Sequence, residues 1–179
     1  MIKPLILVTA PVQTRSGYGN HARDICRALI ESDKYEVAIQ SVPWGSTPLN
    51  ALDPNDPSHK EIEKRLLRQP QLPKQPEVHL HIVIPNEFKQ FGQKNIGMTA
   101  GIESTVPPAD WIDGCNRMDK VIFTSEFSKK GFTDIKFDKL DKNTKQKVGE
   151  VRLERPSEVL FEGADTNVYK ETNQFSDRM

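Results

Sequence analysis

Hydrophobic residues along the chain form short runs that turn-rich segments separate. One run covers Leu5–Val8, a second covers Val78–Ile84 with two histidines inside it, and a third covers Val121–Phe123. Strands of a parallel sheet are apolar on both sides because helices cover both faces, so they lack a strict alternation. The three runs therefore predict strands that are buried inside one parallel sheet.

The segment after the first run has the pattern of a loop, a helix and a second strand. Pro11–Tyr18 is predicted as the loop. From Ala22 to Ile30, apolar side chains recur three and four positions apart, which places them on one face of a helix. Tyr35–Val42 then alternates apolar and polar residues, as a strand does. This order predicts a βαβ unit with a right-handed crossover.

The rest of the chain continues the alternation of strands and helices. Residues 135–155 differ, because they are dense in Lys, Asp and Glu, and they predict a solvated hairpin with its tip near Asp141. The whole pattern predicts an α/β fold: a Rossmann-like, doubly wound, mainly parallel sheet flanked by helices, with a charged β-hairpin insertion. Residues 1–170 are expected to form this single domain, and residues 171–179 a tail or the start of a hinge. The other expected elements are strands at Ile96–Ile102 and Glu158–Phe161 and helices at Ala109–Met118 and Ser125–Phe132.

Charge and composition argue against several classes of function. The 25 Lys and Arg residues balance the 25 Asp and Glu residues among 179 in total, which disfavours a general nucleic-acid binder. The apolar runs are far shorter than the ~20 residues of a membrane span, and the N-terminus lacks the pattern of a secretory leader. Cys26 and Cys115 both fall on predicted apolar helix faces, so a disulfide scaffold is not expected. We therefore expect a cytoplasmic protein without a membrane span.

Glycines follow the first predicted strand, at the edge where a doubly wound sheet binds ligands. Gly17, Gly19 and Ala22 match the pattern G-x-G-x-x-G/A, in which the backbone approaches a phosphate at a helix N-terminus. A nicotinamide cofactor is disfavoured, because Pro11–Ser16 separate the strand from the first glycine and Gln40 stands where an acidic residue is expected. The pattern indicates either a phosphate loop or a flexible turn without a ligand.

Other polar residues lie on or just after predicted strands. His79 and His81 are two apart and face the same way; a packed or hydrogen-bonded pair is favoured over a metal site, because no third His or Cys lies nearby. Glu87 and Glu103 suit a hydroxyl-bearing ligand or are plain surface carboxylates. Ser125–Glu126 either contacts a phosphate or caps a helix. No Walker A loop, G-x-S-x-G motif or zinc-type cysteine cluster occurs.

Four segments, spread over almost the whole chain, resemble the N-terminal half of a GT-B glycosyltransferase of the family-4-like retaining kind. Residues 16–29 resemble the glycine-rich loop and first helix of that family. Residues 98–111, MTAGIESTVPPADW, resemble the segment that lines its interdomain cleft. Residues 121–132, VIFTSEFSKKGF, are similar to its strand–Pro-Ser–helix element, with Thr124 in place of the common proline. Residues 159–169, VLFEGADTNVY, resemble the strand and segment that lead to its hinge.

This resemblance implies a two-domain enzyme that transfers a sugar from a nucleotide-sugar to a glycan or another hydroxyl-bearing acceptor, with retention of the anomeric configuration. The N-terminal half binds the acceptor, and a C-terminal donor domain, which we expect this chain to lack, binds most of the nucleotide. Little transfer is therefore expected from this chain alone, and a donor domain would act in trans. The nucleotide-sugar is a substrate, and no metal or other cofactor is implied, because helix dipoles and basic side chains can neutralise the diphosphate.

The same resemblance implies roles for individual residues. Gly17, Tyr18, Gly19 and Asn20 would form the donor-phosphate loop, and Glu103 would take the catalytic position. A valine at Gly19 would then block the phosphate while disturbing the fold less. A different class also stays open, a non-catalytic nucleotide-binding, glycan-binding or assembly module of the same fold. The acceptor side of the cleft would carry Arg15, Arg23, Asn86, Glu87, Ser104, Thr105, Ser125 and Glu126.

Overall fold

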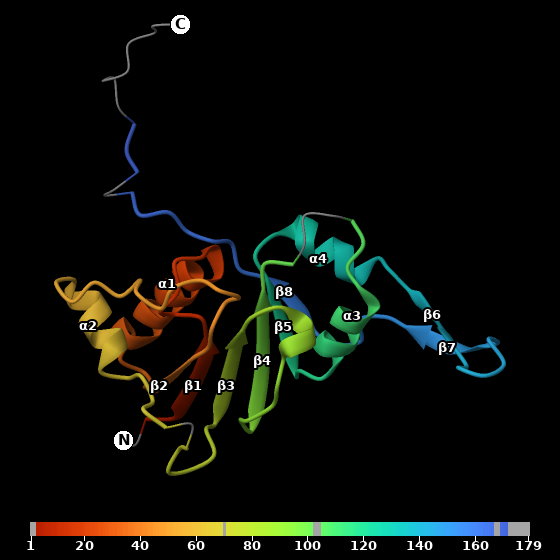
Figure 1. Cartoon of the computed structure of the whole chain (residues 1–179), viewed down its shortest axis with the longest axis horizontal. Coiled ribbons are helices and arrows are strands. Elements are labelled where there is room, and N and C mark those ends of the chain that lie inside the picture. The colour runs from red at the N-terminus through yellow and green to blue at the C-terminus, as the bar shows by residue number, and fades with distance from the viewer. Residues whose placement is uncertain (1–2, 70, 102–104, 167–168, 172–179) are drawn as a thin grey trace, which may run out of the picture.

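A computed structural model describes residues 3–69, 71–101, 105–166 and 169–171 of the chain. Its centre is a sheet of six strands in the order β2-β1-β3-β4-β5-β8, and all neighbouring strands in it are parallel. The predicted α/β fold class is confirmed (Figure 1). The strands are β1 (Leu5–Ala10), β2 (Glu36–Ser41), β3 (Val78–Ile82), β4 (Lys94–Thr99), β5 (Lys120–Phe123) and β8 (Ser157–Val159).

The sheet is doubly wound, because the chain leaves β1 first toward one side and later toward the other. It passes from β1 to β2, and residues 65–67 add a short parallel bridge beyond β2. There the Ile39 N–H donates to the Arg65 carbonyl at 2.9 Å, and the Leu67 N–H donates to the Ile39 carbonyl at 2.8 Å. The chain then crosses to β3 and continues outward through β4, β5 and β8. In such sheets, ligands bind beyond the carboxyl ends of the strands near the reversal, here between β1 and β3.

Helices cover the two faces of the sheet in different places. The face that carries Val8 and Ala10 packs against α1, and α2 packs beside α1. The opposite face packs against η1, α3 and α4 in the region of β5, where Phe123 and Phe132 are fully buried. The helices are α1 (Gly17–Glu31), α2 (Pro57–Glu63), the 3-10 turn η1 (Pro85–Glu87), α3 (Ala109–Asn116) and α4 (Glu126–Thr133).

Within the described ranges, no helix lies over β1 and β2 on the face opposite α1. Leu5, Leu7 and Ala38 are buried there, and Leu67 and Leu72 cover them. The covering residues belong to the irregular segment between the bridge and β3. Loop, instead of helix, therefore closes this part of the sheet.

The charged stretch at residues 135–155 forms the predicted hairpin. Strand β6 (Phe137–Leu140) pairs antiparallel with β7 (Lys147–Val151), and the pair projects from the body of the molecule (Figure 1). Phe137 and Val151 pack against the apolar cluster around α3, which fixes the base of the hairpin. Farther out, the Lys147 ammonium lies 2.7 Å from an Asp138 carboxylate oxygen. The base is thus part of the core, and the tip is solvated.

Candidate functional site

Helix α1 begins just beyond the carboxyl end of β1. Ser16 is its N-cap, and the Ser16 hydroxyl accepts a hydrogen bond from the Gly19 N–H at 3.0 Å. The residues Gly17–Asn20, expected in a loop, are therefore the first turn of the helix. Glycine has a poor helix propensity, so the apolar pattern starts the helix only at Ala22, whereas the serine cap marks its true start.

The two glycines of this turn have different surroundings. Gly17 is exposed, and a Cβ added to it would meet none of the described atoms within 4 Å. Gly19 is buried, and a Cβ there would lie 2.3 Å from the Thr14 carbonyl oxygen. The expectation that a side chain at Gly19 would spare the fold is therefore wrong, because it would strike the protein's own backbone. Gly17 is the glycine that leaves backbone open to a ligand.

Arg23 holds the loop between β1 and α1 from inside. It is 7 % exposed, and its guanidinium donates to the Val12 and Thr14 carbonyls at 2.8 and 2.9 Å and to Asn20 Oδ1. Burial lowers the pKa of Arg23, but a guanidinium remains charged at neutral pH. These three acceptors are all neutral oxygens. A cation and a helix N-terminus thus lie together, and both favour an anion.

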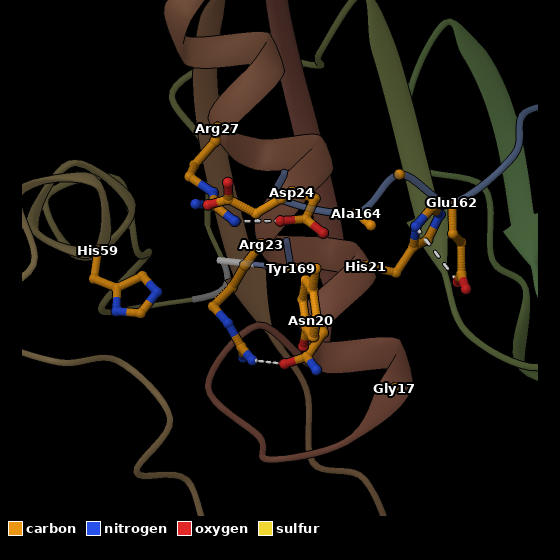
Figure 2. Close-up of a pocket in the computed structure, with 12 residues that line it drawn as sticks. Gly17, Asn20, His21, Arg23, Asp24, Arg27, His59, Glu162, Ala164 and Tyr169 are labelled. Carbon is orange, nitrogen blue, oxygen red and sulfur yellow. Dashed lines mark hydrogen bonds and ion pairs between the residues drawn. The ribbon is translucent and has the colours of Figure 1, made fainter. Parts of the chain in front are cut away.

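A pocket of about 570 Å³ opens beside the first turns of α1 (Figure 2). Helix α1 forms one wall, His59 of α2 contributes to a second, and the segment after β8 forms a third. Segments that are far apart in the sequence therefore meet at one site. The residues that line it are Gly17, Asn20, His21, Arg23, Asp24, Arg27, His59, Glu162, Gly163, Ala164, Asp165 and Tyr169.

Charges of both signs line this pocket, and they are not evenly mixed. Arg27 pairs with Asp24, so these two charges offset each other. Arg23 keeps its charge near the start of α1, whereas Glu162 lies on the side of His21 (Figure 2). The pocket thus offers one place for an anion and, apart from the paired Asp24, two carboxylates, Glu162 and Asp165, that can accept hydrogen bonds from hydroxyl groups.

His21 is buried beside Glu162. The distance from His21 Nδ1 to Glu162 Oε1 is 3.6 Å, and His21 Nε2 lies 3.0 Å from the sulfur of Met98. Burial lowers the pKa of His21 below its ordinary value, and the smaller effect of Glu162 opposes this. The imidazole is therefore neutral at neutral pH and adds no positive charge beside Glu162.

Tyr18 connects α1 to the segment that follows β4. Its hydroxyl accepts a hydrogen bond from the Ala100 N–H at 3.1 Å and shares a hydrogen bond of 2.8 Å with the Thr99 hydroxyl. The chain then turns at Gly101, whose φ is +80°, and a Cβ there would lie 2.9 Å from the Ser128 side chain. Both the backbone angle and the space require glycine. The start of the predicted cleft segment is therefore fixed between α1 and α4.

Several predicted site residues do not line the pocket. Arg15 is exposed and donates to the side chain and the carbonyl of Asn50 at 3.1 and 3.2 Å. Asn86 and Glu87 are exposed on η1, on the other side of the sheet from α1. Thr105 is exposed in the loop before α3. The structure therefore groups only part of the expected cleft.

The remaining predictions fall at α4 or outside the described chain. Ser125 is the N-cap of α4, and its hydroxyl accepts from the Ser128 N–H at 3.0 Å, so the helix-cap alternative is confirmed. Glu126 follows it in the first helical turn and is exposed. Glu103 and Ser104 lie outside the described residues. Their expected roles stay predictions.

The residues that close the pocket were not expected from the sequence. His59 was expected only within a helix-capping box at residues 58–61, and Glu162 and Asp165 belong to a segment that was expected only to lead to a hinge. The position of Glu162 and Asp165 follows from topology, because the chain after β8 must emerge at the carboxyl edge of a parallel sheet. This polar run after the last strand was the signal that could have found them.

No family model, curated protein or solved structure matches the chain. Among the described residues, no group of three or more His, Cys, Asp or Glu side chains has a metal-binding arrangement. In the same part of the chain, none of the helices has the length and apolar character that a bilayer crossing demands.

Proposed function

We propose that the chain forms the acceptor-side domain of a GT-B glycosyltransferase and that the pocket beside α1 holds part of a nucleotide-sugar. The split polarity of the pocket carries the proposal: Gly17 and Arg23 lie at the start of α1, and Glu162 lies beside His21. A sugar joined to a phosphate is divided in the same way, with a negative charge at one end and neutral hydroxyl groups at the other. Its phosphate seeks N–H donors and cations, and its hydroxyl groups donate to carboxylates.

The chemistry of transfer gives the anionic end of the pocket its role. The bond between the anomeric carbon and a phosphate oxygen breaks, the acceptor hydroxyl bonds to that carbon and loses its proton, and negative charge grows on the leaving diphosphate. The N-terminal turn of α1, at Gly17, would stabilise that charge. Arg23 would add to this field from a fixed position, because the loop carbonyls of Val12 and Thr14 hold its guanidinium.

The carboxyl edge of the sheet also offers a surface for a donor domain. Exposed apolar side chains follow β4, β5 and β8 at this edge, and clustered apolar exposure is typical of contact surfaces. A donor domain that closes over this edge would bring a nucleotide-sugar to the pocket and the acceptor to the loops. These side chains are Val106, Phe127, Leu160 and Phe161, with exposed fractions of 52, 55, 46 and 68 %.

The proposal is tested by NMR of backbone amides while millimolar nucleotide-sugars such as UDP-glucose or GDP-mannose are added. We expect a saturable shift of the Gly17 amide, and its loss in Gly17→Val, whose side chain would point into the open space of the pocket. The unfolding midpoint of this variant should not fall, because valine has a better helix propensity than glycine. Gly149→Val is the matched control, since Gly149 on β7 also has open space around it and lies outside the pocket.

Two results would contradict the proposal. One is a Gly17 amide that no nucleotide-sugar shifts at millimolar concentration, and the other is a shift that Gly17→Val leaves unchanged. Robust sugar transfer by this chain alone would instead contradict the expected division of labour with a donor domain, since transfer needs donor and acceptor held together.

A further inference from the structure

A second pocket lies on the face of the sheet opposite α1, at the carboxyl ends of β1, β2 and β3. Its volume is about 210 Å³, and it shares no residue with the pocket beside α1. It occupies the part of the sheet that loop covers instead of helix. The residues that line it are Thr9, Gln40, Val42, His81, Val83, Glu87, Lys89 and Phe91.

His81 presents a hydrogen-bond donor of fixed direction to this pocket. The ring is 4 % exposed, and its Nδ1 accepts a hydrogen bond from the Lys89 N–H at 3.1 Å. Because Nδ1 accepts, the ring proton of the neutral imidazole must be on Nε2. Within the described ranges, Nε2 has no hydrogen-bond partner in the protein and is not fully buried, and His81 lines the pocket. The Nε2–H is therefore available to a ligand.

A chain of hydrogen bonds fixes a second donor at Gln40. The Gln40 Oε1 can only accept, so the Thr9 hydroxyl donates to it at 3.3 Å. The Thr9 oxygen in turn accepts from His79 Nε2 at 2.9 Å. These contacts orient the amide of Gln40, and its nitrogen has no partner among the residues that the structure describes. His81 and Gln40, which both line this small space, thus each have an N–H donor without a described protein partner.

The remaining wall determines what kind of ligand suits the space. Glu87 and Lys89 bring one negative and one positive charge, so the pocket has no net preference for an anion or a cation. Val42 and Val83 are apolar, and the Phe91 ring is 45 % exposed. An exposed aromatic face next to directed polar groups suits a ring that has both C–H surfaces and hydroxyl groups.

The geometry points to a binding site for one neutral sugar ring, stacked on Phe91 and hydrogen-bonded to His81, Gln40 and Glu87. At ~30 Å³ per water molecule in the liquid, the space corresponds to about seven waters, which is enough for a pyranose. A neighbouring hollow of about 400 Å³ shares Gln40 and Phe91, so a glycan could continue past the first ring. This pocket shares no residue with the proposed nucleotide-sugar site, and Glu87, which was predicted on the acceptor side of the cleft, is among the residues that line it.

The test is a long-range ¹H–¹⁵N spectrum of the histidine rings, recorded while methyl glucoside, methyl galactoside or methyl mannoside is added. We expect His81 to show the Nε2–H tautomer and at least one sugar to shift this signal in a saturable way. Phe91→Ala should weaken the binding by about tenfold or more, as loss of a stacked aromatic does. Phe127→Ala is the matched control, because Phe127 is a 55 % exposed phenylalanine outside the pocket.

A second variant tests the binding site with a substitution that should not affect folding. The side chain of Glu87 makes no hydrogen bond to any described residue, so Glu87→Gln should fold normally and weaken the binding several-fold through loss of a charged acceptor. The inference is overturned if no sugar shifts His81, if cyclohexanol shifts it equally well, or if folded Phe91→Ala and Glu87→Gln bind as the natural chain does.

Discussion

At the scale of single residues, the two buried histidines of β3 show how burial fixes a protonation state. Burial lowers the pKa of His79 to about 4 and that of His81 to about 3. Protonation of His81 would remove the acceptor for the Lys89 N–H, and protonation of His79 would place an N–H where Nδ1 has no described partner. The rings are 5.1 Å apart, so two positive charges would also repel each other.

Stability should therefore fall when the solution becomes acidic. Both histidines have an ordinary pKa of 6.5, so between pH 6.5 and pH 4 the unfolded chain binds protons that the folded chain refuses. The free energy of unfolding therefore rises with pH across this window. As the pH falls through the window, the protein loses several kcal/mol of stability from the pair, at about 1.4 kcal/mol for each tenfold difference in proton affinity between the folded and unfolded chain. His21, whose pKa is also lowered, adds a change of the same sign.

Urea unfolding between about pH 7 and pH 5 measures this loss. The carboxylates with lowered pKa values, such as Asp56 and Glu61, act mainly below this range and so do not obscure it. NMR titration of the ring protons provides the residue-level check. A titration midpoint near 6.5 for either His79 or His81 in the folded protein would show that the prediction is wrong.

The sequence could not separate the two glycines of α1, although their structural reasons differ. Gly17 and Gly19 belong to one motif, and only the position of Thr14 shows that Gly19 is a packing contact. Ser16, in contrast, was a usable signal, because a serine before a helical pattern marks the N-cap. What a side chain touches across the fold is not encoded in local spacing, and this is why the pocket was only partly predicted.

At the scale of elements, Arg23 is the link that joins α1 to the loop before it. The Val12 and Thr14 carbonyls lie beyond the last residues of β1 and depend on Arg23 for their side-chain donor. Arg27, one turn later, only pairs with Asp24 at the surface. We therefore expect Arg23 to contribute more to the stability of the fold than Arg27, although both lie on α1.

Arg23→Met should therefore destabilise the protein by about 1–3 kcal/mol, because it leaves buried carbonyl oxygens without a donor. Arg27→Met is the matched control and should change the free energy of unfolding by less than ~1 kcal/mol, as exposed ion pairs do. Chemical denaturation of the two variants measures both values. Equal effects would contradict the structural role assigned to Arg23.

The elements themselves were largely predictable, because apolar runs and helical spacing report burial directly. The runs at Leu5, Val78 and Val121 became β1, β3 and β5, and the charged stretch became the hairpin. Boundaries were less predictable, since they depend on caps. The bridge at residues 65–67 was missed altogether, because a contact made by two hydrogen bonds leaves no pattern in the sequence.

At the scale of the whole molecule, the segment after β8 contributes residues to the pocket but few buried contacts to the fold. Glu162 and Asp165 line the pocket, yet the described residues from 160 onward are exposed. A chain that ends at Phe161 should keep its thermal midpoint within ~4 °C, the shift that about 1 kcal/mol produces at this size. It should also lose the shift of Gly17 by nucleotide-sugars.

A chain that ends at Pro156 is the contrasting variant. It lacks β8, whose backbone pairs with Val121, Ile122 and Phe123 of β5, so its midpoint should fall well below that of the longer truncation. Thermal melts followed by circular dichroism compare the two. If the truncation at Phe161 also unfolds, the segment after β8 has a structural role that its exposure does not indicate.

The two edges of the main sheet determine how readily another chain could add a strand to it and start aggregation. At one edge β8 has only three residues, and at the other the contact beyond β2 is a single bridge at Leu66. Aggregation by strand addition needs a long, flat row of unpaired N–H and C=O groups; β8 is too short to provide one, and the bridge at Ile39 interrupts the row along β2. Glu158 also places a charge on β8, and its partner Lys120 stands on the neighbouring strand. The main sheet, as far as the structure describes it, thus presents little edge on which a fibril could grow, although its central strands are strongly apolar.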